Sequence, residues 1–194
     1  LDKAKNDIRK KNYAVLVEGQ IDLVLSHQSG IANTVASSGT AFTEAHLERL
    51  KKLSSRIILA FDGDKAGEMA AEKASVLGIS LGFEVKVARL PEGSDPAEVA
   101  QKNAEEWKNI LRESIPAIEF FLGKVEEREK DQRKLGKLIE TKILPMIRLL
   151  RSSIEQSHFI SLIAKRTGIK EQVLWDDLKK MAAVARKTTK VSST

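Results

Sequence analysis

The sequence predicts an α/β fold, in which a parallel sheet flanked by helices is followed by an all-α region. In the first half, short apolar runs alternate with segments of helical spacing, and this strand-then-helix unit occurs four times, a pattern typical of parallel sheets. From residue 104 onward we find no strand pattern and expect four or five helices before residue 182. We therefore expect an α/β domain over residues 1–103, a helical subdomain over 104–182 and a polar tail or linker over 183–194.

Apolar alternation and turn residues define the elements of the first half. Strands are expected within residues 13–19, 33–40, 57–61 and 84–90, and helices within 21–30, 43–53, 65–82 and 97–103. Gly30 is a typical helix end, and Thr43 is a typical N-cap. Right-handed crossovers between parallel strands place the carboxyl ends of all the strands at one edge of the sheet.

Helix signals mark the second half. Ser114 followed by Pro116 is typical of a helix start. Pro145 lies inside an apolar helical pattern and is expected to kink or divide that helix. Thr167 and Gly168 are typical of a helix end, after which another amphipathic helix follows.

The composition excludes several classes of protein. The chain has 194 residues, of which 42% are hydrophobic and none is cysteine, so disulfides and thiolate metal sites are excluded. The longest apolar runs are too short for a membrane span, and we expect a cytoplasmic monomer that does not associate with membranes. The chain begins at Leu1 rather than Met, and we take it to be part of a longer protein.

The net charge of +6 is concentrated in the second half. Residues 1–112 contain 16 basic and 16 acidic side chains, whereas residues 113–194 contain 17 and 11. A basic region of this kind favours contact with nucleic acid through phosphates. A solvated helical surface is the alternative explanation.

Acidic side chains follow three of the predicted strands. Glu18 ends the first strand, Asp62 and Asp64 end the third, and Asp95 lies in the loop after the fourth. In an open parallel sheet, binding sites form at the carboxyl ends of the strands, so these acids are expected to lie close together. Asp22, four residues after Glu18, is placed either to face the same cleft from the next helix or to serve only as a first-turn acid that the helix dipole favours, which is the commoner role.

Such a cluster needs a compensating charge or proton. Two carboxylates about 4 Å apart repel each other by roughly 4 kcal/mol at an effective dielectric constant of 20. A raised pKa on one acid is one solution. A hard divalent cation is the other, and oxygen ligands alone suit Mg²⁺ or Mn²⁺.

Ordinary structural roles remain open for the same residues. Asp62 or Asp64 is suited to cap the helix that begins near Lys65, and Asp95 before a proline is a routine helix start. Lys65 is a candidate phosphate contact, although a single lysine is more often solvated. The loop containing Gly39 and Thr40 is expected at the same edge, where its backbone N–H groups are suited to bind phosphate.

Four short motifs follow one another in the first half of the chain. They are EGQIDL (18–23), SSGTAFT (37–43), FDGDKAG (61–67) and LPEGSDP (90–96). In their order and spacing they resemble the TOPRIM domain, the metal-binding module of bacterial-type primases, type IA and II topoisomerases and some nucleases. The full set is similar to the bacterial replicative DNA primases in particular. The resemblance to TOPRIM covers about residues 13–103, and the helices that follow resemble the helical subdomain of those primases.

The resemblance implies RNA primer synthesis on a single-stranded DNA template by nucleotidyl transfer. It implies that Glu18, Asp62 and Asp64 are catalytic metal ligands for one to three Mg²⁺ or Mn²⁺ ions, and that Asp22 and Asp95 support the acidic cluster. It also implies ribonucleoside triphosphates and an RNA primer as ligands. Zinc would bind in a domain absent from this chain, and a replicative helicase would bind through a region beyond it.

The chain departs from the family pattern at one position of the acidic cluster. The family has a second acid two residues past Asp95, where this sequence has Ala97. The chain also lacks the zinc-binding domain and the basic part of the polymerase core that would precede Leu1, so we expect it to bind metal but to make little or no primer alone.

Two alternative functions remain. One is another TOPRIM enzyme, a nuclease or part of a topoisomerase. The only tyrosine, Tyr13, lies at the start of the first strand, away from the acidic edge, which disfavours the topoisomerase. The other is a non-catalytic module that docks on nucleic acid or a replication partner through its basic helical half.

Overall fold

The computed structural model describes residues 1–39 and 41–191. The chain divides into two compact units, Leu1–Ala117 and Ile118–Thr194. None of the helices in the described part of the chain combines the length and the apolar character that a membrane span needs.

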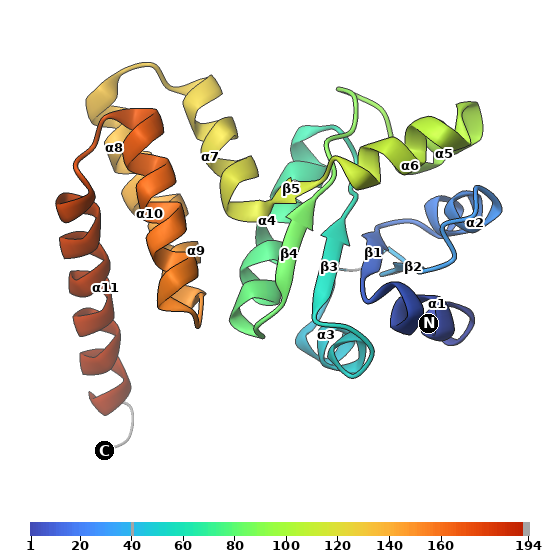
Figure 1. Cartoon of the computed structure of the whole chain (residues 1–194), viewed down its shortest axis with the longest axis horizontal. Coiled ribbons are helices and arrows are strands. Elements are labelled where there is room, and N and C mark those ends of the chain that lie inside the picture. The colour runs from blue at the N-terminus through green and yellow to red at the C-terminus, as the bar shows by residue number, and fades with distance from the viewer. Residues whose placement is uncertain (40, 192–194) are drawn as a thin grey trace. The chain divides into compact units, whose positions relative to one another are not determined.

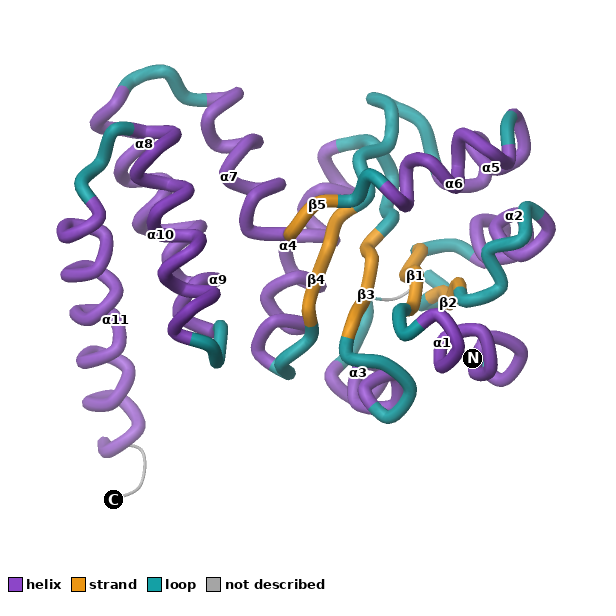
Figure 2. The backbone as a smooth tube through the Cα atoms, viewed as in Figure 1, coloured by secondary structure: helices purple, strands orange, loops and turns teal. Residues whose placement is uncertain are grey.

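A five-stranded sheet forms the centre of the first unit (Figures 1 and 2), with the strand order β2-β1-β3-β4-β5. The strands are β1 Ala14–Val17, β2 Thr34–Ala36, β3 Arg56–Leu59, β4 Glu84–Val87 and β5 Ile115–Pro116. The first four strands are parallel, and β5 runs antiparallel to β4. The predicted α/β class and the four predicted strands are therefore confirmed.

Helices cover both faces of this sheet. They are α1 Lys5–Lys11, α2 Gln20–Gln28, α3 Glu44–Lys51, α4 Lys65–Ser80, α5 Pro96–Lys102 and α6 Ala104–Arg112, after a short 3-10 turn, Asp2–Ala4. On one face, Val15, Val17 and Ile58 pack with residues of α2, α5 and α6 in one apolar cluster. On the other face, α4 lies so close to the sheet that a Cβ on Gly78 would be 2.9 Å from a methyl carbon of Val85.

The boundary between the two units lies further along the chain than we expected. We placed the division after residue 103, but Trp107 and Leu111 of α6 are buried in the apolar cluster of the sheet. The prediction of no strand beyond residue 104 is wrong, because Ile115 and Pro116 pair with β4. Ser114 therefore precedes a strand, and the next helix begins at Ala117.

The second unit is helical. Its elements are α7 Ala117–Arg128, α8 Gln132–Leu138, a π-helical turn Ile139–Ile143, α9 Leu144–Leu149, α10 Ser153–Thr167 and α11 Glu171–Val191. Pro145 lies at the start of α9, which confirms that this proline divides a helical stretch. Gly168 ends α10 with a φ of 75°, as predicted. The side chain of Arg166 pairs with Glu126 of α7 and tethers α10 to it.

Two other expectations for the helices need revision. The described chain has six α-helices from α6 to α11, where we expected four or five. The polar tail expected over 183–194 is helical as far as Val191, because α11 continues through it. Residues 192–194 lie outside the described residues.

Candidate metal centre

Parallel strand pairing brings the predicted acids to one edge of the sheet. Leu16 of β1 pairs with Leu59 of β3, so Glu18 and Asp62 follow neighbouring strands at the same level. The backbone N–H of Ala60 donates to the carbonyl of Leu16 (2.9 Å) and extends this pairing beyond β3. Because these neighbouring strands end at the same level, the acids that follow them lie at one edge of the sheet, as predicted.

The glycines of the FDGDKAG segment permit close contacts between backbones. The N–H of Gly63 donates to the carbonyl of Ser94 (2.8 Å), and the N–H of Gly93 donates to the carbonyl of Gly63 (3.0 Å). A Cβ on Gly63 would lie 2.2 Å from the carbonyl oxygen of Pro91, and one on Gly67 would lie 2.2 Å from the carbonyl oxygen of Asp62. Gly63 thus holds the loop before Asp95 against the loop that carries Asp62 and Asp64.

Asp22 joins the starts of two helices. Its side chain is only 7% exposed, and its carboxylate accepts hydrogen bonds from the N–H groups of Gly19 (2.9 Å) and Ala97 (3.1 Å). Gly19 is the N-cap of α2, and Ala97 lies in the first turn of α5. Asp22 therefore braces the segment after Glu18 against the segment after Asp95. The sequence predicted a supporting acid here, but not its partner at position 97, because that contact spans 75 positions of the chain.

Two of the acids also cap helices, which was the alternative role considered for them. Asp64 Oδ1 accepts from the N–H of Gly67 (2.7 Å) at the start of α4. Asp95 Oδ1 accepts from the N–H of Glu98 (2.6 Å) at the start of α5. Each cap uses one carboxylate oxygen, so capping does not exclude a second role for Asp64 or Asp95.

Electrostatic repulsion is unrelieved among the more buried acids. Burial, and then the charges of Asp62, Asp64 and Asp22, raise the pKa of Glu18. Burial, followed by Asp22, Asp95 and Asp64, raises the pKa of Asp62. Burial also raises the pKa of Asp22, although its two backbone hydrogen bonds oppose that shift. The five acids therefore act on one another as a single cluster.

A divalent cation fits this chemistry. Glu18 Oε1 is buried and has no hydrogen-bond partner within the described structure, which is costly for a carboxylate oxygen. The donors are all oxygens, as Mg²⁺ and Mn²⁺ prefer. However, no three His, Cys, Asp or Glu side chains of the described residues converge closely enough to hold a metal ion as they stand. Coordination of one ion by three of these carboxylates would therefore require them to change rotamer, whereas one or two carboxylates and water can hold Mg²⁺ without a third.

Two of the three candidate phosphate contacts, Lys65 and Gly39, lie around the same edge. Lys65 is the first residue of α4 and is exposed. The loop after β2 approaches Glu18, because Ser37 Oγ donates to the carbonyl of Glu18 (3.3 Å). Gly39 follows in that loop with a φ of 82°, and Thr40 lies outside the described residues. Contact of Lys65, Gly39 or Thr40 with phosphate stays a prediction.

Comparison with known proteins agrees with this geometry. A family model described as Toprim-like matches residues 15–100. The DNA primase of Clostridium acetobutylicum is 32% identical over 165 residues, which cover 84% of this chain and 27% of that protein. The crystal structure of the Aquifex aeolicus primase, with its zinc-binding and RNA polymerase domains, has a TM-score of 0.74 at 27% identity and covers 89% of this chain and 41% of that one.

A further structure, of the DnaG primase catalytic domain bound to ssDNA, has a TM-score of 0.73 at 25% identity, covering 87% of this chain and 55% of that one. The fold and the acidic edge thus define a Toprim-like domain. The chain belongs to the bacterial DNA primase family and corresponds to the TOPRIM-containing part of its catalytic core. It spans about a quarter of the length of the curated relatives it matches.

Proposed function

We propose that Glu18, Asp62 and Asp64 bind Mg²⁺ or Mn²⁺, and that in the whole protein this centre takes part in RNA primer synthesis on a single-stranded DNA template. The observation that carries the proposal is the buried, unpartnered Glu18 Oε1 beside carboxylates that raise one another's pKa. A divalent ion compensates several such carboxylates at once, whereas a proton neutralises one.

The residues of the chain have distinct roles in this proposal. Glu18 and Asp62 supply the partly buried ligands, and Asp64 supplies a ligand at the exposed side of the cluster. Asp22 positions the backbone beneath Glu18, and Asp95 adds negative charge from the adjoining loop. When bound, the metal would neutralise the phosphates of an incoming nucleotide and activate the attacking hydroxyl.

The substrates and partners follow from the family. One related structure is of a catalytic domain bound to ssDNA, which supports a single-stranded DNA template for the whole protein. Ribonucleoside triphosphates are the expected substrates, and RNA the expected product. We further propose that the chain is monomeric, that one to three ions bind at the acidic edge, and that a replicative helicase binds elsewhere in the whole protein.

A calorimetric titration with Mn²⁺ tests the metal centre. The native chain is expected to bind Mn²⁺, and an Asp62→Asn/Asp64→Asn variant is expected to lose that binding. A Glu48→Gln/Glu113→Gln variant is the matched control, because it removes two exposed carboxylates outside the cluster. Equal binding by the native chain and the Asp62→Asn/Asp64→Asn variant would contradict the proposal.

A second experiment separates primer synthesis from hydrolysis. We expect little or no primer from this chain alone, because it spans only part of its relatives, and primer synthesis from the whole protein that the Asp62→Asn/Asp64→Asn change abolishes. Incubation of the chain with plasmid DNA and Mn²⁺ is expected to leave the plasmid intact. Metal-dependent cleavage that requires Asp62 and Asp64 would instead identify a TOPRIM nuclease.

A further inference from the structure

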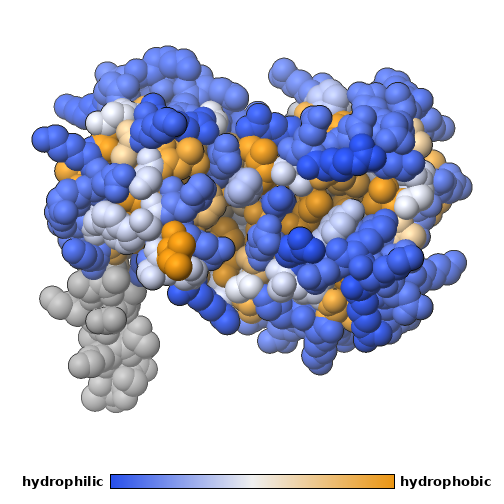
Figure 3. Space-filling model, viewed as in Figure 1, coloured by the Kyte–Doolittle hydropathy of each residue, from blue (hydrophilic) through white to orange (hydrophobic). Residues whose placement is uncertain are grey.

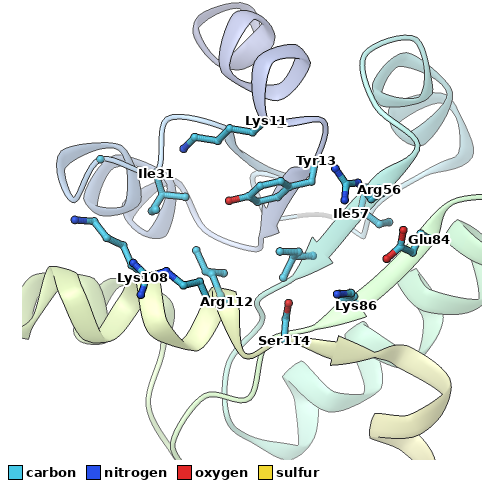
Figure 4. A pocket seen from close by; sticks show the side chains of 13 residues that line it. Lys11, Tyr13, Ile31, Arg56, Ile57, Glu84, Lys86, Lys108, Arg112 and Ser114 are labelled. Carbon is cyan, nitrogen blue, oxygen red and sulfur yellow. The ribbon is translucent and has the colours of Figure 1, made fainter.

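A pocket lies over the sheet towards the amino ends of β1, β3 and β4, and none of the five acids lines it (Figure 4). Tyr13 precedes β1, Arg56 begins β3 and Glu84 begins β4, so the pocket opens at the amino ends of the strands. Glu18 lies five residues beyond Tyr13, roughly 16 Å along an extended strand. The pocket is therefore separate from the candidate metal centre.

The pocket has the volume and the apolar lining that are typical of a small-molecule site. Its volume is about 460 Å³, and small-molecule pockets typically range from about 300 to 1,000 Å³. Ile31, Ile57 and Leu111 line it and are buried. Figure 3 shows apolar surface in a hollow of the first unit, bordered by hydrophilic side chains. An apolar floor with a polar border is the usual composition of a ligand site.

Positive charge dominates the lining. Five cationic side chains line the pocket, against the single carboxylate of Glu84. The cations are Lys11, Arg56, Lys86, Lys108 and Arg112. They come from α1, β3, β4 and α6, so the fold gathers the charge rather than any local run of basic residues. Cations around a concave, partly apolar surface focus a positive potential into it.

Two of the five cations have uncharged hydrogen-bond partners. Lys11 Nζ donates to Asn33 Oδ1 (3.0 Å), and Arg56 Nε donates to the carbonyl of Asn12 (2.9 Å). Both acceptors are uncharged, so they orient these side chains without cancelling their charge.

The cations from α6 have an anionic partner that a ligand can replace. Lys108 and Arg112 pair with Glu105 at 3.3 and 3.1 Å. The side chain of Glu105 is 61% exposed, and exposed ion pairs are weak. A multiply charged anion in the pocket can therefore compete with Glu105 for both cations.

We propose that this pocket binds the phosphate groups of a free, nucleotide-sized ligand. The cations would contact the phosphates, and the ring of Tyr13 would lie beside the apolar or aromatic part of the ligand. Figure 4 shows Tyr13 and Ser114 pointing into the pocket from opposite sides. Because the cations surround a hollow and do not follow a track along the surface, the site suits a compact ligand better than a nucleic-acid strand, which needs an extended groove.

The test is calorimetric titration of the full 194-residue chain with inorganic tripolyphosphate and with ATP. EDTA is present, so that the acids at the other edge cannot hold phosphate through a metal ion. We expect saturable binding at about 150 mM salt, where long-range charge effects are screened. A Lys86→Gln/Arg112→Gln variant is expected to bind at least roughly tenfold more weakly.

Two matched variants make the test specific. Lys10→Gln/Arg49→Gln changes the net charge equally at exposed positions outside the pocket and should keep the affinity within about twofold. Asp62→Asn/Asp64→Asn should also keep it. If the first pocket variant fails to fold, Lys11→Gln/Lys108→Gln replaces it, with the same expected loss.

Four results would overturn the proposal. They are the absence of saturable binding, an equal loss of affinity in the pocket variant and the control, loss of binding in Asp62→Asn/Asp64→Asn, and pocket-dependent binding of a short single-stranded oligonucleotide without binding of ATP or tripolyphosphate. The last two would assign the phosphate affinity to the acidic edge or to a nucleic-acid strand. None of them depends on whether the acids bind metal, because all titrations are free of divalent ions.

Discussion

The two edges of the same sheet differ in charge and in how their side chains are held. At the carboxyl ends of the strands, Asp62 and Asp95 lie in loops joined by backbone hydrogen bonds and by close glycine contacts. At the pocket, Lys86 and Arg112 have long side chains that line an open cavity. The acids are thus placed by the backbone, whereas the cations are placed largely by side-chain conformation.

This difference predicts which substitutions should lower the stability of the fold. A change that displaces a backbone at the acidic edge should affect the whole first unit, because the loops there pack on each other without free space. Replacing a cation at the other edge should change binding and leave stability nearly unaffected. Substitutions at Gly63 and Asp22 test how far the acidic edge depends on its backbone, and one at Asp62 tests the cost of its charges.

The largest effect is expected for Gly63→Ala. The added Cβ would meet the carbonyl oxygen of Pro91 at 2.2 Å, and a backbone atom cannot move aside as a flexible side chain can. The expected loss in the free energy of unfolding is about 2–3 kcal/mol. Urea unfolding followed by the fluorescence of Trp107, in a Trp175→Phe background, measures it in the first unit.

Gly136→Ala is the control for this prediction. Nothing lies within 4 Å of a Cβ at Gly136 in α8, so alanine should stabilise that helix by about 0.5–1 kcal/mol. Far-UV circular dichroism during urea unfolding detects the change. A Gly63→Ala variant as stable as the native chain would show that the contact between the two loops does not hold the acidic edge.

An intermediate effect is expected for Asp22→Ala. The substitution leaves the N–H groups of Gly19 and Ala97 without their acceptor, which should destabilise the first unit by about 2 kcal/mol. Asp22→Asn keeps one acceptor oxygen and should lose about half as much. The same Trp107 unfolding measurement compares the two variants. Equal stability of Asp22→Ala and the native chain would mean that these hydrogen bonds are replaced by water at no cost.

The sequence predicted the acidic edge well because its signals are local. Strand endings, the acids that follow them and the caps at Thr43, Asp64 and Asp95 each depend on a few neighbouring residues. The same locality explains the predicted division at Pro145.

The features that the sequence missed depend on partners distant in the chain. Strand β5 has two residues and exists through its pairing with β4. The apolar face of α6 gave no indication that it would pack on the sheet and move the boundary to Ala117. The sequence did not predict the basic pocket for the same reason, since its cations come from four separate elements.

The smallest effect concerns the repulsion among the acids, and it depends on pH. Without metal, burial and neighbouring carboxylates raise the pKa of Asp62 in the folded state. The folded protein therefore binds a proton there more tightly than the unfolded chain does. The resulting stability is fully present below the unfolded pKa of about 4 and is lost as the pH rises through the raised folded value.

Asparagine at position 62 carries no charge, so the Asp62→Asn variant does not lose stability in this way as the pH rises. In EDTA, the variant should exceed the native chain in free energy of unfolding at pH 7 by less than about 1 kcal/mol, since the site is partly solvated, and the difference should vanish at low pH. Saturating Mn²⁺ should reverse the order at pH 7, because an ion that binds only the folded native chain stabilises it. A variant that is less stable than the native chain in EDTA at pH 7 would contradict this prediction. It would mean that Asp62 makes a structural contact that outweighs its repulsion by the neighbouring carboxylates. The acidic edge would then be adapted for folding and not for a cation.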